Sequence, residues 1–241
     1  MQEKLHMTLH PGINPPPFTT FISEIVEKNI FLEKTFCYPR GGGQQGDTGI
    51  IANTNIQAQL LETLPGESII HPMDSVVGFN VGDEVKCAIN QQRRNKNTTM
   101  HTVQHIVSAI ANDLFGAETV GNQISEEYTR IDLQFPDRDK FLQSELEESV
   151  NDIIRSNKRV NIHNWDRESI LSHEQMRHTK FMDRIPSSIT QLRVVEIEDV
   201  DLCPCGGTHV DNTSKLNEIN ITNVKSKGAG KLRLSYNLNN H

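Results

Sequence analysis

Residues 1–92 alternate hydrophobic and polar positions in short runs that are separated by Gly, Pro, Asn and Asp. The runs lie at residues 18–27, 29–38, 47–53, 56–64, 67–72 and 83–90. A period of two is typical of strands that bury one face, and short strands at regular spacing indicate an antiparallel barrel or sandwich. We therefore expect residues 1–92 to form an all-β domain.

The hydrophobic positions take a helical period after residue 92. Residues 97–116 predict a helix that Asn97 or Thr98 caps and Gly116 ends, because apolar residues recur every three or four positions between them. Two further helices are expected at residues 139–158 and 166–178, and strands at 128–135, 159–165, 189–198, 218–224 and 231–238. Helices and strands that do not strictly alternate predict an α+β domain over residues 93–241.

The charge of the chain limits its partners. The 241 residues carry 24 basic and 31 acidic side chains, a formal net charge of -7, which argues against nonspecific adhesion to nucleic acid, and a DNA partner is not expected. Two local basic tracks remain: one contains Arg93, Arg94 and Lys96, and the other contains Lys225, Lys227, Lys231 and Arg233 among glycines. Each track is either a solvated surface or a site that binds phosphate.

The N-terminal residues show no secretory signal, and the sequence has no run of eighteen apolar residues. These features predict a soluble, cytoplasmic protein without a membrane partner. In such a chain the four cysteines are expected to be free thiols or metal ligands rather than disulfides.

Three adjacent glycines at residues 41–43 interrupt the strand pattern in "YPRGGGQ". Glycine weakens a strand, so these residues predict a tight loop or a close approach of the backbone to another molecule. No Gly-Lys-Ser or Gly-x-Gly-x-x-Gly pattern follows them, and a nucleotide-binding loop is not expected.

Two pairs of side chains have the spacing of metal ligands. His101 and His105 lie four residues apart on the predicted helix, which places their side chains on one face, about 6 Å apart. Cys205 and His209 are also four apart, and the two glycines between them indicate a turn. One thiolate and three imidazoles suit tetrahedral zinc, so the four residues predict one zinc ion.

Two other chemistries are less consistent with these residues. A protease-type zinc helix requires Glu directly after the first His, where this chain has Thr102. A redox site at Cys203 and Cys205 is disfavoured because the motif is Cys-Pro-Cys rather than Cys-x-x-Cys, which leaves Cys203 without an assigned role.

The motifs "MHTVQH", "TRIDLQF", "RVVEIEDVDLCPCGGTHV" and "VKSKGAGKLRLSY" together resemble the AlaX family of freestanding alanyl-tRNA editing proteins. These are similar to the editing domain of alanyl-tRNA synthetase and, more distantly, to that of threonyl-tRNA synthetase. The resemblance implies an N-terminal antiparallel β-barrel over residues 1–92, with the Gly-rich loop, and an α+β editing domain with a helix-borne zinc site over residues 93–241.

The resemblance also implies a function: zinc-dependent, ATP-independent hydrolysis of serine, and in some members glycine, from the acceptor end of tRNA(Ala). Catalytic side chains are not assigned. Substrate contacts are expected from Thr208, Gln123 and Asp132, of which Asp132 would orient an imidazole or the substrate amine. Contacts to tRNA are expected from Gly42, Gly43, Gln44, Arg93, Arg94, Lys225 and Lys227. The alternative is a noncatalytic RNA-binding module that zinc stabilises.

Overall fold

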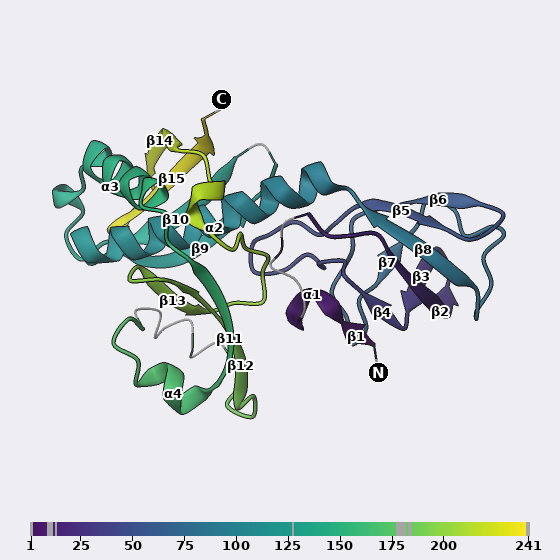
Figure 1. Ribbon diagram of the computed structural model, residues 1–241. Helices are drawn as coiled ribbons and strands as arrows, with labels where there is room; N and C mark the ends of the chain where they lie inside the picture. Colours follow the sequence, from purple (N-terminus) through teal and green to yellow (C-terminus); the bar gives the residue numbers. More distant parts are fainter. Residues whose placement is uncertain are drawn as a thin grey trace. The chain divides into compact units, whose positions relative to one another are not determined.

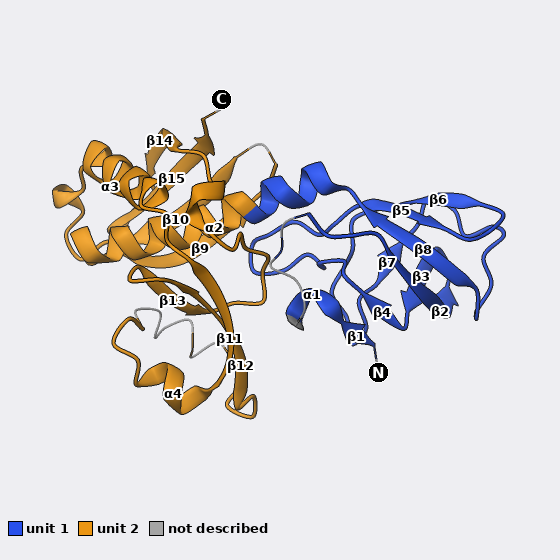
Figure 2. Cartoon of the chain, in the orientation of Figure 1, with its two compact units in different colours: residues 1–98 blue, residues 99–241 orange. Residues whose placement is uncertain are grey.

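The computed structural model describes residues 2–8, 12, 14–126, 128–176, 182 and 185–239. The chain forms two compact units, residues 1–98 and 99–241 (Figure 2). The first unit consists mainly of strands, whereas the second combines helices with two antiparallel sheets (Figure 1). The fold is therefore mixed α+β, as the sequence predicts.

The first unit contains a curled antiparallel sheet of six strands in the order β6-β5-β8-β2-β3-β7. Its strands are β2 (Phe18–Val26), β3 (Asn29–Leu32), β5 (Gly49–Ala52), β6 (Gln57–Leu60), β7 (His71–Pro72) and β8 (Glu84–Ile89). A bridge between Leu60 and Met73 links the two outer strands, and the Leu61 amide donates a hydrogen bond to the Pro72 carbonyl at 2.8 Å. The sheet therefore bends far enough for its first and last strands to meet at this point.

The alternating pattern explains why these strands form one core. In β8 the side chains of Val85, Cys87 and Ile89 are buried and those between them are exposed. A short parallel pair, β1 (Glu3–Lys4) with β4 (Lys34–Thr35), and the single turn α1 (Leu5–Thr8) complete the unit.

Helix α2 (Gln91–Phe115) is longer than the sequence predicts, and the boundary between the two units falls within it. Its cap is Asn90, whose side-chain oxygen accepts a hydrogen bond from the Arg93 amide at 3.1 Å. The predicted caps, Asn97 and Thr98, are instead buried within the helix. Gly116 ends the helix as predicted, at a positive φ of 63°.

The second unit has a four-stranded antiparallel sheet in the order β14-β15-β10-β9. Its strands are β9 (Glu118–Ile124), β10 (Thr129–Gln134), β14 (Ile219–Ser226) and β15 (Lys231–Leu238). Helix α2 contacts this sheet through Ser108 and Thr119, whose hydroxyls lie 2.8 Å apart. Helix α3 (Gln143–Arg155), which follows the short η1 (Arg138–Lys140), is joined to β14 by two hydrogen bonds: the Asn151 amide donates to the Ile219 carbonyl, and the Asn151 side-chain oxygen accepts from the Ile219 amide.

A second, three-stranded antiparallel sheet positions the Cys-containing loop. It consists of β11 (Val160–Asp166), β12 (Gln191–Ile197) and β13 (Asp201–Pro204), in that order. The helix predicted at residues 166–178 is only α4 (Arg167–Leu171), which Asp166 caps by accepting from the Ser169 amide. Residues 177 and 178 of that prediction lie outside the described residues. The short η2 (Thr213–Lys215) follows the loop.

Candidate metal centre

Helix α2 and the loop after β13 bring four predicted side chains together. His101 and His105 lie on α2, and Cys205 and His209 lie on the loop; one possible ligand atom of each lies within 4.8 Å of those of the others. The Cys205 sulfur is 3.6 Å from His101 Nε2 and 3.4 Å from His209 Nε2. All three imidazoles are buried. The two ligand pairs that the sequence keeps far apart therefore form one cluster.

Gly207 allows the loop to approach the helix this closely. A Cβ added at Gly207 would lie 2.0 Å from the His101 ring carbon Cε1, far inside contact distance. Gly207 does not have a positive φ, so its lack of a side chain matters for space rather than for a left-handed backbone. The chain bends at Gly207, as the predicted turn requires, and the close approach to His101 adds a steric reason for this glycine.

Two hydrogen bonds orient the imidazoles. His105 Nδ1 lies 2.9 Å from a carboxylate oxygen of the fully buried Asp201, which leaves Nε2 of that ring available to the cluster. His209 Nδ1 lies 3.2 Å from the Thr102 hydroxyl, which also accepts a hydrogen bond from the Val210 amide at 3.1 Å. Thr102, which stands where a protease-type helix has Glu, therefore holds the loop in place.

Burial and neighbouring groups shift the pKa values within the cluster. Burial raises the pKa of the Cys205 thiol, but the neighbouring His101 and His209 lower that pKa well below its usual value and favour the thiolate. Burial and the charge of His101 lower the pKa of His209 to about 3, which keeps that ring neutral. Burial would also lower the pKa of His105, but its bond to Asp201 and the Cys205 sulfur raise it to about 10.

The donor set fits a metal ion. One cysteine sulfur and three imidazole nitrogens, which are common metal ligands, lie within 4.8 Å of one another. Sulfur together with nitrogen suits a divalent transition metal rather than calcium or magnesium. Burial raises the pKa of Cys203, so that the first cysteine of the motif stays a thiol.

A polar row beside the cluster was not expected from the sequence. The Asn122 amide donates to the Gln104 side-chain oxygen at 3.2 Å, and the Gln104 amide donates to the Ser108 hydroxyl at 2.7 Å. Gln104 is three residues after His101, so both lie on the same face of α2. That spacing could have identified Gln104, whereas Asn122 depends on which face of β9 is turned towards the helix.

The predicted substrate residues are divided between two locations. Thr208 is buried in the loop between Cys205 and His209. Gln123 lies opposite Arg130 in the register of β9 and β10, and therefore on the face of the sheet opposite to Asn122. Asp132 is on that same face and accepts hydrogen bonds from Arg233 at 2.6 and 2.8 Å. The structure therefore does not place Gln123 and Asp132 at the cluster, and Asp201 orients His105 instead.

The predicted tRNA contacts in the first unit also differ in accessibility. Gly42 and Gly43 are exposed at positive φ values of 56° and 85°. Gln44 is buried, and Arg93 Nε donates to the Gly46 carbonyl at 3.0 Å.

Arg94 has no exposed surface and forms an ion pair with Asp47. Burial therefore removes Arg94 as a phosphate ligand and gives it a structural role. In the second unit Lys225 and Lys227 are exposed, as a phosphate contact requires.

Comparison with known proteins places the chain among tRNA-related sequences. Residues 192–235 match the model of the threonyl and alanyl tRNA synthetase second additional domain, and residues 13–93 match that of class II (A) tRNA synthetases. The alanyl-tRNA editing protein AlaX-M of Methanosarcina mazei is 32% identical over 92% of this chain and 91% of its own. AlaX-M of Saccharolobus solfataricus is 34% identical over 86% of this chain and 87% of its own.

A longer relative also matches: the chain corresponds to 50% of AlaX-L of Pyrococcus horikoshii, at 32% identity. Within the described residues, none of the helices has the length and apolar character needed to cross a membrane.

Proposed function

Because the chain belongs to the AlaX family of alanyl-tRNA editing proteins, we propose that it is a deacylase that acts in trans on mischarged alanine tRNA. The proposed substrate is Ser-tRNA(Ala), with Gly-tRNA(Ala) as a second one, and the bond broken is the aminoacyl ester at the acceptor end. The observation that carries the proposal is the buried convergence of His101, His105, Cys205 and His209.

We propose zinc as the metal, held by these four side chains. Bound zinc would polarise the ester carbonyl or lower the pKa of a water molecule to about 7. The protein contributes the orientation of the donors: Asp201 fixes His105, Thr102 fixes His209, and Gly207 leaves room for the His101 ring. These contacts hold the site in shape before substrate arrives.

Selectivity for serine follows from the failure of a simple size filter. A synthetase pocket built for alanine rejects an added hydroxyl only weakly, so a second site must remove the error. That site spares alanine if it hydrogen-bonds the serine hydroxyl, since alanine would leave its buried polar groups unpaired. Gln104, Asn122 and Thr208 are the polar side chains that we propose for this contact. Glycine lacks the hydroxyl and should be the poorer substrate.

For the tRNA we propose contacts from the exposed Gly42 and Gly43 and from the half-buried Arg93 in the first unit, which we regard as the β-barrel expected from the sequence. In the second unit we propose contacts from Lys225 and Lys227. Positive side chains and exposed glycine amides are the groups that bind phosphate oxygens.

The competing function is a noncatalytic RNA-binding module. Four protein ligands fill a tetrahedral shell, which is typical of structural zinc, whereas catalytic zinc usually keeps one position open. Tight binding of tRNA without release of serine would support this alternative.

Deacylation assays separate the two functions. The purified protein is given Ser-, Gly- and Ala-tRNA(Ala) and Ser-tRNA(Thr), before and after chelation and again after zinc is restored. We expect serine release to depend on zinc, to exceed glycine release, and to spare alanine. His105→Ala should lower the rate by more than about a hundredfold, because even partners of metal ligands contribute up to that much.

His163→Gln is the matched control, since His163 pairs with Glu196 outside the cluster. A folded, zinc-loaded protein that releases no serine would refute the enzyme.

A further inference from the structure

The four-stranded sheet of the second unit has one buried face and one solvent face. Ile131, Leu133 and Leu234 lie on the buried face and are fully inaccessible. Residues that lie opposite one another in the register of neighbouring strands share a face of the sheet. Arg233 lies opposite Asp132 on one side and opposite Lys225 on the other. Lys231 lies opposite Gln134. Arg130, two residues before Asp132, is on this face too. We call Arg130, Lys225, Lys227, Lys231 and Arg233 the basic sheet face.

The positive charge of this face is only partly neutralised. Arg233 is paired with Asp132. Arg130, Lys225, Lys227 and Lys231 form no ion pair within the part of the chain that the structure describes. Arg233 first, and Arg130 and Lys227 after it, hold the pKa of Asp132 below its usual value, which shows that these cations lie close together. Such a concentration of positive charge contrasts with a net charge of -7 for the chain.

An exposed aromatic ring lies at the edge of the basic sheet face. Tyr128 is 38% exposed and precedes Arg130 by two residues, immediately before β10. The Ser125 hydroxyl donates to the Tyr128 carbonyl at 2.8 Å, which fixes the backbone there. The Tyr128 phenol is also close enough to Arg233 to raise the pKa of that guanidinium, after the larger effect of Asp132. Cations beside an exposed ring are the combination that binds phosphates and stacks an unpaired base.

We infer that the basic sheet face is an RNA-binding surface, on which Lys225, Lys231 and Arg130 contact phosphates and Tyr128 stacks an unpaired base. The inference rests on the proposed function in one respect: the RNA is then the tRNA substrate. It adds to that function a defined surface and a stacking residue. It also gives Tyr128 and Lys231 a role in binding, which the proposed function does not assign to them.

The phosphate contacts are tested by salt dependence. Binding of an uncharged tRNA(Ala) transcript is measured by fluorescence anisotropy between 50 and 200 mM salt, for wild type and for Lys225→Ala combined with Lys231→Ala. Each phosphate contact makes affinity fall about threefold to fourfold over this interval. The double variant should therefore lose about tenfold less affinity than wild type across it.

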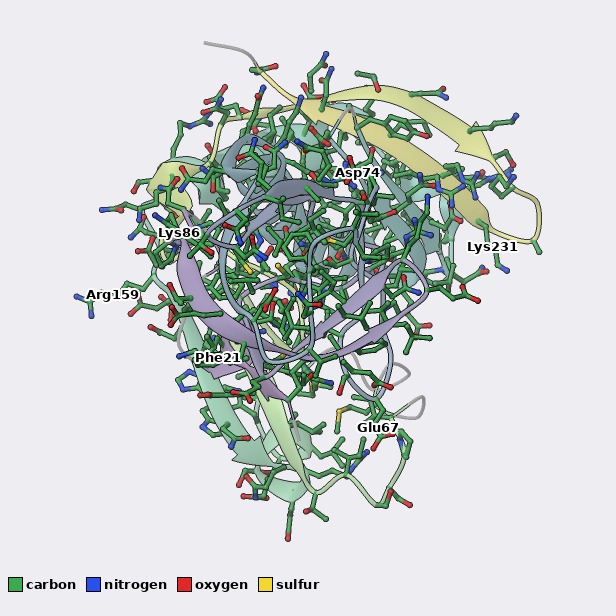
Figure 3. All side chains as sticks on the ribbon, turned by 90° about the vertical axis from the view of Figure 1, so that its right-hand side faces the viewer. Phe21, Glu67, Asp74, Lys86, Arg159 and Lys231 are labelled. Carbon is green, nitrogen blue, oxygen red and sulfur yellow. The ribbon has the colours of Figure 1, made fainter. Side chains whose placement is uncertain are left out.

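Arg159→Ala combined with Lys215→Ala removes the same charge from the same unit and is the matched control. Arg159 and Lys231 lie on opposite sides of the view in Figure 3. The control should keep the wild-type salt slope. A double variant with the wild-type slope, or a control with the larger change, would overturn the inference.

Stacking is tested at Tyr128. Tyr128→Ala should weaken binding roughly fivefold to a hundredfold, whereas Tyr128→Phe keeps the ring and should bind like wild type. Wild-type affinity in the Ala variant would overturn the stacking part.

Binding to vesicles of phosphatidylglycerol is measured as well, for wild type and for the double variant. Vesicle binding that depends on Lys225 and Lys231, with tRNA binding unchanged, would assign the face to an anionic membrane and refute RNA binding.

These experiments fail separately from those on the proposed function. Binding of uncharged tRNA requires no hydrolysis. If serine release fails but the salt slope falls in the double variant, the proposed function is wrong and the RNA-binding surface stands. If serine release proceeds but the slope is unchanged, the deacylase function stands, whereas the RNA-binding surface and the proposed tRNA contact of Lys225 are both wrong.

Discussion

The two parts of helix α2 bury polar side chains with opposite consequences. In its first turns, Arg94 is enclosed by groups that complement it: Nε donates to Asp47 at 2.9 Å, and the two terminal nitrogens donate to the carbonyls of Phe36 and Gly12 at 2.7 and 3.3 Å. Later in the helix, His101 and His105 lie beside Cys205 and His209, and each of these four side chains carries an atom that could bind a metal ion.

The difference shows what burial alone does not reveal. Around Arg94 the protein supplies the opposite charge of Asp47 and backbone carbonyls that accept from the guanidinium, so Arg94 has a structural role. Around His101 it supplies four side chains that could together hold a metal ion, so the cluster has the composition of a binding site. The chemistry of the neighbouring side chains, rather than the depth of burial, distinguishes a structural ion pair from a candidate binding site.

The largest effect is expected when the buried ion pair of Arg94 and Asp47 is broken. Arg94→Ala leaves the Asp47 carboxylate buried and uncompensated, and should lower the free energy of unfolding by about 3–5 kcal/mol in urea denaturation. Arg94→Met combined with Asp47→Leu removes both charges and should restore most of the loss. If the double variant were as unstable as the single one, packing rather than charge would account for the effect.

The next largest effect is expected when a side chain is added at Gly207, beside the cluster of possible metal ligands. Gly207→Ala puts a Cβ into the His101 ring, which must move by about 1 Å or more, and such a displacement costs about a hundredfold in rate. Zinc affinity, measured against a competing chelator, should fall with serine release. Gly121→Ala is the control, because its added Cβ meets Asp132 at an ordinary 3.4 Å. Equal rates for the two variants would contradict the steric role of Gly207.

His71 provides an imidazole that the protein completes without a metal. Its Nδ1 donates to the Ile30 carbonyl at 3.2 Å and its Nε2 accepts from the Thr35 hydroxyl at 3.0 Å. Burial lowers the pKa of His71 to about 4. The unfolded ring, with a pKa of about 6.5, takes up a proton first as the pH falls, so stability decreases below pH 6.5 and levels off below pH 4.

This linkage should cost about 2.5 kcal/mol of unfolding free energy between pH 7.5 and 4.5. Urea denaturation of wild type and His71→Gln measures it, since only the wild type carries the contribution of this group. Parallel pH curves for the two proteins would show that His71 does not titrate on unfolding, and zinc should not alter their difference.

The smallest effect is expected for Asp201, the carboxylate that orients the possible metal ligand His105. Asp201→Asn keeps an acceptor for His105 but removes the charge, and should weaken zinc binding about tenfold to a hundredfold. Chelator competition measures the affinity, and Asp132→Asn is the control that should leave it unchanged. The reverse result would restore Asp132, the carboxylate that the sequence favours, to the role of orienting the ring.

The sequence predicts those features that depend on local spacing. Two residues four apart on a helix share a face whatever the rest of the fold does, which is why His101 and His105 could be paired. The alternating strands of residues 18–90 were also readable, because burial of one face imposes a period of two. The thiolate and third imidazole followed from chemical complementarity.

Features that depend on register and on distant contacts could not be predicted. Gln123 and Asn122 are neighbours in sequence, and only the pairing of β9 with β10 decides which one is turned towards α2. Asp201 and Asp132 are equally suitable carboxylates until β13 is placed beside the helix. Arg94 is identical in sequence terms to an exposed phosphate ligand, and its burial depends on Asp47, which is 47 positions away.

The pair of Asp47 and Arg94 also orders events during synthesis. The last strand of the first unit's sheet ends at Ile89, before Arg94 has been added to the chain. Until the beginning of α2 leaves the ribosome, a nascent sheet would have to bury Asp47 without its guanidinium partner, at a cost of several kcal/mol. The first unit is therefore expected to complete its fold only after the start of α2, the helix that carries His101, has left the ribosome.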